Sequence, residues 1–266
     1  MKAPERNPAS ENTVNIPDTR VLRLRPVHLR KLAAIAEVKG KVLFSKNFII
    51  MPAFSLGFTL LMKVIYGAAA QGEFNTNVYA LTLGVLMNIC MEGVYCTAAA
   101  LAEEKEKNTL RTLMTSSVNG LEFFIGSLIP VVLMSTVVNV LCIFIAGFDM
   151  GILQWAAFLA VTVACSAISA VIGMIFGIYT KTQVSAGTIT TPALLILMMI
   201  PLFRGFNDTL EMISEFLFTG IIYNTISNIN SSLPVTDVKG IIILAAEFIL
   251  SVIVFLALYR KNGFER

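Results

Sequence analysis

The sequence predicts an all-α polytopic membrane protein that crosses the bilayer with six transmembrane helices. Composition is the first reason, because 56% of the residues are hydrophobic, 14% are charged and the mean hydropathy is +0.77. Soluble domains carry about 25% charged residues, so this composition excludes an ordinary soluble enzyme and a disordered protein. The second reason is a set of six long apolar runs, since a helix needs roughly 20 apolar residues to cross a bilayer.

The apolar runs place the expected transmembrane helices at 48–70, 77–102, 121–147, 152–178, 184–203 and 239–260. Lysine and arginine indicate the orientation, because cytoplasmic loops carry an excess of these residues. With both termini inside, every lysine and arginine except Lys63, Arg204 and Lys239 falls on the cytoplasmic side. We therefore expect a multi-pass protein of the plasma membrane with both termini in the cytoplasm.

The chain before the first run divides into two parts. Residues 1–26 are polar and rich in proline, which predicts a mobile cytoplasmic tail. Residues 27–46 repeat apolar side chains at the spacing of a helix: Leu32, Ile35, Val38 and Val42. Lys31 and Lys39 project toward this stripe, and their long stems can snorkel, which favours an amphipathic helix on the membrane interface. A plain extension of the first transmembrane helix is the alternative.

The largest segment expected on the outer side is 204–238. Asp208 to Glu211 has the pattern of a capping box, and the apolar side chains that follow are too few to span the membrane. We expect one or two short re-entrant helices that dip into the outer leaflet. A partly buried outer loop is the alternative.

The sequence offers little for catalysis. It contains no G-x-x-x-x-G-K-[ST] phosphate loop, no H-E-x-x-H zinc motif and no G-x-S-x-G nucleophile elbow. Its single histidine is His28, and its cysteines all lie in apolar runs, where they are expected to pack as small hydrophobes: Cys90, Cys96, Cys142 and Cys165. We expect no catalytic residue, no metal site and no cofactor on this chain, and the net charge of +3 does not suggest nucleic acid as a partner.

The expected cytoplasmic loop after the second run, 103–120, is dense in charge. Glu103 and Lys107 have the i, i+4 spacing that stabilises a helix. Leu110 and Leu113 form an apolar ridge just after them. An exposed ridge beside mixed charges favours docking of a cytoplasmic partner, and a charged loop at the membrane edge is the plain alternative.

The run Glu104-Lys105-Glu106-Lys107-Asn108-Thr109-Leu110, continuing through Leu113 to Gly126 and Pro130, resembles the E-R-E-K-G-T-L…L…P…G-K-L-x-P signature of ABC-2 type transporter permeases. Asn108 stands where the signature has glycine, Ser117 where proline is common and Ser127 where lysine is common. The expected order of an amphipathic helix, six spans and short outer helices before the sixth is also similar to this family, over residues 27–260.

The resemblance implies the membrane subunit of a small bacterial ABC exporter, with residues 47–260 as its transmembrane domain and 261–266 as a cytoplasmic tail. The 103–120 loop would then hold a coupling helix that docks on a separate ATP-binding subunit, and Mg-ATP would bind to that subunit. The coupling candidates are Glu103, Glu104, Lys105, Glu106, Lys107, Thr109, Leu110 and Leu113. A second permease copy, in a homodimer or as a paralogue, completes the expected assembly, and the absence of an outer domain favours an amphipathic substrate such as a peptide, a drug or a lipid-like molecule.

Ionisable residues within expected spans are costly and mark functional hypotheses. Lys63 and Glu247 lie at similar depths near the outer ends of the first and sixth spans, which predicts an ion pair within one subunit or across a dimer. The alternative is that Lys63 snorkels alone and Glu247 faces a wet cavity. Asn88 and Glu92 share one face of the second span, either as a polar wall of the transport path or, in the alternative, with a protonated Glu92 carboxyl in an interhelical hydrogen bond.

A secondary transporter driven by an ion gradient is the competing function, with Glu92 or Glu247 carrying protons. The sequence shows no inverted repeat to support it. The charged 103–120 loop also has no evident role in such a carrier.

Overall fold

The computed structural model describes residues 28–69, 75–109, 120–231, 235 and 237–262. These residues are almost entirely helical, and none of them lies in a strand. Six helices are long and apolar enough to cross a membrane: Ile50–Ala68, Thr76–Glu106, Glu122–Ala146, Ile152–Tyr179, Gln183–Leu202 and Val238–Tyr259. The predicted all-α fold with six transmembrane helices is therefore confirmed. The predicted mobile tail, 1–26, lies outside the described residues.

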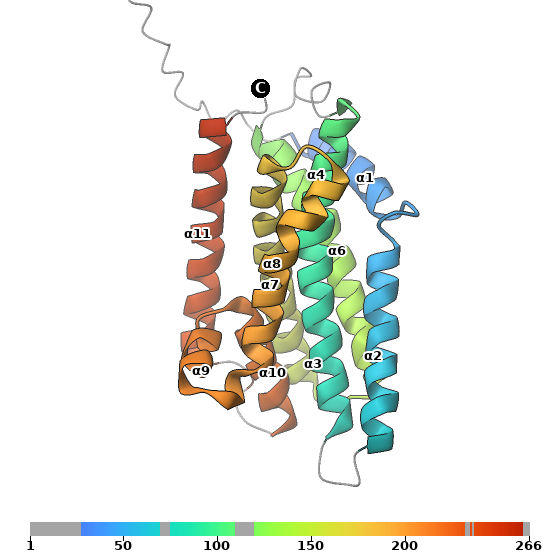
Figure 1. The fold of residues 1–266 in the computed structure, drawn as a ribbon, viewed down its shortest axis with the longest axis vertical. Helices are drawn as coiled ribbons and strands as arrows, with labels where there is room; N and C mark the ends of the chain where they lie inside the picture. The colour runs from blue at the N-terminus through green and yellow to red at the C-terminus, as the bar shows by residue number, and fades with distance from the viewer. Residues whose placement is uncertain (1–27, 70–74, 110–119, 232–234, 236, 263–266) are drawn as a thin grey trace, which may run out of the picture.

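The helices follow one another as α1 (Leu29–Leu43), α2 (Ile50–Ala69), α3 (Thr76–Asn88), the π-helix η1 (Ile89–Cys96), α4 (Thr97–Glu106), α6 (Gly120–Ala146), α7 (Ile152–Tyr179), α8 (Gln183–Leu202), the 3₁₀ turn η2 (Arg204–Phe206), α9 (Asp208–Glu215), α10 (Phe218–Asn230) and α11 (Val238–Asn262). Figure 1 shows α2 and α11 on opposite flanks of the bundle. We call the end that carries α1 and the last turns of α11 the terminal end, and the end that carries α9 and α10 the opposite end.

The second span is one continuous rod of α3, η1 and α4, and it is the most deeply buried of the six. Its π-helical middle packs closely against α7. A Cβ atom on Gly93 would lie 1.8 Å from Ser169 Oγ, and one on Gly173 would lie 2.5 Å from the Val94 carbonyl oxygen. Glycine is therefore required at both positions for the two backbones to approach this closely.

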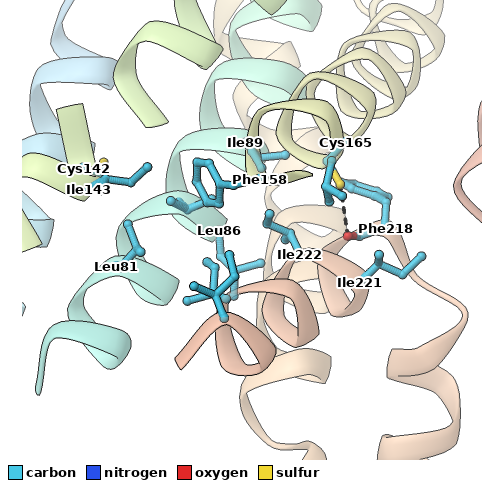
Figure 2. Close-up of a cluster of buried hydrophobic side chains, with 14 of the residues drawn as sticks. Leu81, Leu86, Ile89, Cys142, Ile143, Phe158, Cys165, Phe218, Ile221 and Ile222 are labelled. Carbon is cyan, nitrogen blue, oxygen red and sulfur yellow. Dashed lines mark hydrogen bonds between the residues drawn. The ribbon is translucent and has the colours of Figure 1, made fainter. Parts of the chain in front are cut away.

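The hydrophobic core of the opposite half lies between the second span, α6, α7 and α10 (Figure 2). The Cys165 thiol donates a hydrogen bond to the Phe218 carbonyl oxygen at 3.4 Å and so ties α7 to the first residue of α10. All four cysteines are buried and free, and they pack among apolar side chains. Short α10 is mostly buried because its isoleucines fill this core: Ile221, Ile222, Ile226 and Ile229.

Two short helices, α9 and α10, occupy the 204–238 segment. The cap of α9 is Asn207, whose side chain accepts a hydrogen bond from the Thr209 amide at 2.9 Å. The predicted capping box that begins at Asp208 is therefore wrong by one residue. Glu211 does not reach back to the cap, because it pairs with Arg204 at 3.0 Å. The position of these helices in the outer leaflet stays a prediction.

Candidate functional site

Charged side chains gather at the terminal end of the bundle, where α4 ends at Glu106. Three successive side chains of this segment, those of Glu104, Lys105 and Glu106, each contact a different helix of the bundle. Together with Lys39 they form a cluster that we call the polar junction.

The first contact is a buried ion pair between α4 and α1. Lys39 Nζ lies 2.5 Å from both carboxylate oxygens of Glu104 and 4.5 Å from the centre of the Phe123 ring. Lys39 is only 8% exposed. Burial lowers the pKa of the Lys39 amine, and the negative charge of Glu104 opposes that shift. Each charge therefore offsets part of the free-energy cost of burying the other.

This geometry corrects the prediction that Lys39 snorkels toward the membrane interface. The Lys39 side chain points into the bundle, on the same face of α1 as the buried Ile35 and Leu43. The position of Lys39 on the apolar stripe of a helix was the sequence signal for a buried charge. Its partner Glu104 is 65 residues away in the chain. Only the packing of α1 on the bundle brings the two charges together.

The second and third contacts reach the turn between the fourth and fifth spans. Lys105 Nζ donates to the carbonyl oxygens of Gly177, Ile178 and Thr180 at 2.6, 2.7 and 3.2 Å. The last carbonyl groups of a helix lack intrahelical partners, and a cation there also opposes the helix dipole. Glu106 Oε2 accepts a hydrogen bond at 3.3 Å from the amide of Gln183, the first residue of α8.

Glu122 ties α6 to the start of α1. Its carboxylate is 1% exposed and accepts a hydrogen bond from the His28 backbone amide at 2.8 Å. Glu122 is not among the site residues predicted from the sequence. The available signal was a single acidic side chain in the first turn of a long apolar helix.

The remaining coupling candidates differ in their surroundings. Glu103 and Lys107 form an i, i+4 ion pair on the surface of α4, and the lysine side chain is 65% exposed. The Thr109 hydroxyl donates to the Glu104 carbonyl oxygen at 3.2 Å. Leu110 and Leu113, together with the expected coupling helix, lie outside the described residues.

A cavity of about 210 Å³ separates α1 from α4 beside the polar junction. Apolar and charged side chains share its wall: Ile35, Val38, Lys39, Val42, Ala100, Glu103, Glu104, Lys107 and Thr109. Thr109, the last described residue before the gap at 110–119, lines this cavity.

A family model described as ABC-2 family transporter protein matches residues 30–257. The chain belongs to the ABC-2 transporter family. The match begins in α1 and ends in α11, so it includes the polar junction and all six spans. The resemblance to ABC-2 permeases is thereby confirmed, and the chain is a multi-pass membrane subunit of an ABC transporter. No curated protein matches the chain.

Asn108 occupies the position where the ABC-2 signature has glycine, and its backbone shows why glycine is common there. Asn108 has a φ of 57°, in the left-handed region. It follows the last turn of α4, and its amide donates to the Lys105 carbonyl oxygen at 3.0 Å. Asparagine is one of the few residues other than glycine that adopts this conformation readily.

We expect Asn108→Gly to preserve or slightly raise the stability of this ABC-2 subunit, and Asn108→Val to lower it by about 1–2 kcal/mol. The physical reason is the clash of a branched side chain with the backbone at positive φ. Apparent melting temperatures of the purified variants in detergent test this order. A valine variant as stable as the wild type would contradict it.

The ionisable residues within the spans of this ABC-2 chain have contacts other than the predicted ion pair. Lys63 Nζ donates to the Ile145 carbonyl oxygen at 3.0 Å, near the end of α6. Glu247 lies on α11, on the opposite flank from α2, and the structure shows no ion pair between these two described residues. The predicted pair within one chain is therefore wrong, because their helices lie too far apart. Pairing across a dimer stays a prediction.

Glu247 lies instead beside the start of α10. The backbone amide of Phe218 donates to its carboxylate, while Glu247 Oε2 has no partner among the described residues. This contact joins α11 to the short helix α10. The predicted wet cavity around Glu247 stays a prediction.

Asn88 and Glu92 both point into the bundle. The Asn88 amide donates to Asn139 Oδ1 at 2.9 Å and to the Ser135 carbonyl oxygen at 3.1 Å on α6. Glu92 lies in η1 and is 1% exposed, and neither of its carboxylate oxygens has a hydrogen-bond partner among the described residues. Asn88 thus bonds to α6, whereas the suggested interhelical hydrogen bond of a protonated Glu92 carboxyl is not present among the described residues. A transport role for either residue stays a prediction.

Proposed function

We propose that this ABC-2 subunit works as a dimer with a separate ATP-binding subunit and moves an amphipathic substrate, such as a peptide, a drug or a lipid-like molecule, out of the cell. The ATP-binding subunit binds Mg-ATP and docks on the 103–120 loop. Both termini and the polar junction then face the cytoplasm.

The observation that carries this proposal is the set of contacts made by Glu104, Lys105 and Glu106. These side chains connect the chain segment just before 110–119 to α1, to the end of α7 and to the start of α8. A displacement of the docking segment would therefore be passed to three other helices through charged contacts. Networks of packed side chains, hydrogen bonds and ion pairs are one physical means by which conformational change passes between two sites.

A further observation supports docking at this end. The cavity between α1 and α4 is lined by both apolar and charged side chains, which suits contact with another protein.

The test is co-purification of the tagged chain with the ATP-binding subunit encoded beside it, followed by ATPase assays in nanodiscs. We expect a stable complex in which Glu106→Ala/Leu110→Ala lowers ATP hydrolysis by about fivefold or more, a typical allosteric coupling. Asp149→Ala is the matched control, because this exposed carboxylate lies between α6 and α7 at the opposite end. A chain that purifies alone, or a complex with unchanged activity in the double variant, would overturn the proposal.

A further inference from the structure

A cavity lies at the opposite end of the bundle, away from the polar junction. Its volume is about 320 Å³, at the lower limit of typical small-molecule sites of about 300–1,000 Å³. It is enclosed by the α9–α10 region and the first turns of α11. Its wall is formed by Arg204, Glu215, Ile221, Asn224, Thr225, Asn228, Val235, Asp237, Lys239, Gly240 and Ile243.

Two basic side chains are held in place on this wall. Arg204 donates to Asn224 and to Glu211, and its guanidinium carbon lies 5.3 Å from the centre of the Tyr223 ring. Lys239 Nζ donates to Glu215 Oε2 at 2.6 Å. Arginine has five N–H donors and lysine has three, so these contacts leave donors available to an anion.

The same wall carries two acidic side chains. Lys239 lowers the pKa of Glu215, mainly through their hydrogen bond, so this carboxylate is ionised at neutral pH. Asp237 immediately precedes α11, and its carboxylate has no hydrogen bond or ion pair with the described residues. The cavity wall therefore contains the Asp237 carboxylate, which is free to bind a cation, and the N–H donors of Arg204 and Lys239, which can bind an anion.

The position of the cavity indicates how a ligand would reach it. It lies at the start of the sixth span, Val238–Tyr259, where the membrane boundary is expected. Ile221 and Ile243 give its wall an apolar part. Ile241 and Ile242, on the same turn of α11 as the wall residues Gly240 and Ile243, are 57% and 62% exposed.

We propose that this cavity binds the head group of a phospholipid that carries both an amine and a phosphate. The ammonium group contacts the carboxylates of Asp237 and Glu215, and the phosphate accepts hydrogen bonds from Lys239 and Arg204. The acyl chains lie outside the cavity along the exposed isoleucines of α11. This inference does not depend on the ATP-binding subunit, because it concerns the other end of the molecule.

The test uses the purified full chain in detergent and two short-chain lipids with the same acyl chains, dihexanoyl phosphatidylethanolamine and dihexanoyl phosphatidylglycerol. We expect the ethanolamine lipid to raise the apparent melting temperature at a concentration about fivefold or more below that needed for the glycerol lipid. Asp237→Asn should abolish this preference. Asparagine caps a helix as well as aspartate does, so the variant removes the charge without weakening the start of α11.

Asp208→Asn is the matched control, because this carboxylate starts α9 at the same end but does not line the cavity. The control should keep the preference for ethanolamine. Equal stabilisation by the two lipids, or an unchanged preference in Asp237→Asn, would overturn the proposal. Stabilisation by soluble phosphoethanolamine together with no effect of either lipid would overturn the assignment to a lipid.

Discussion

Replacing Lys39 with methionine is expected to lower the stability of the chain by about 3–5 kcal/mol, the usual cost of removing one partner of a buried ion pair. The loss arises because Glu104 would stay buried without its cation. Glu104→Met should cost a similar amount, since it leaves Lys39 unpaired on the inner face of α1. The measurement is the apparent melting temperature in detergent, where we expect a decrease of about 10 °C for either variant.

The double variant Lys39→Met/Glu104→Met should recover much of this loss, because two apolar side chains replace two charges that both had to be desolvated. Lys41→Met is the control, since Lys41 is exposed and pairs with Glu37 on the same helix. Its effect should stay below about 0.5 kcal/mol. Additive losses in the double variant would show that the two residues stabilise the bundle independently.

Replacing Lys105 with methionine is expected to reduce ATP hydrolysis by the assembled complex about tenfold, within the range of typical allosteric couplings. The variant removes the cation that holds the last carbonyl groups of α7 against the end of α4. The complex should still assemble, because the side chain points into the bundle. Pull-down of the ATP-binding subunit and its ATPase rate, measured on the same preparation, separate the two effects.

Lys105→Arg should restore most of the activity, because arginine keeps the charge and the N–H donors and is the residue in the ABC-2 signature at this position. Lys41→Met is the control, because this exposed side chain pairs with Glu37 on the same helix and does not line the cavity between α1 and α4. We expect it to change the rate less than twofold, since exposed pairs contribute about 0.3–0.5 kcal/mol. Equal losses in both methionine variants would refute a specific role for Lys105.

For the intramembrane polar residues, the sequence predicted the depth of each side chain but not its contacts. Depth along a span follows from counting residues, and it placed Lys63 and Glu247 at similar levels. The rotation and the neighbours of each helix do not follow from counting. In the structure Lys63 bonds to the end of α6, and Glu247 bonds to the start of α10. The predicted pair within one chain is wrong because the two residues, although at similar depths, lie on helices at opposite flanks of the bundle.

The sequence by itself determined the membrane class, the six spans and the family, because apolar length and a short charged signature are local properties of the chain. It also marked Glu104, Lys105 and Glu106 as functional candidates. Only the tertiary structure decided which contacts these side chains make. Their partners on α1, α7 and α8 lie about 65 to 77 residues away in the chain, and packing of the helices alone brings them together. The conformation of Asn108 and the π-helical turn at Glu92 were likewise decided by the fold, since backbone geometry depends on what each segment packs against.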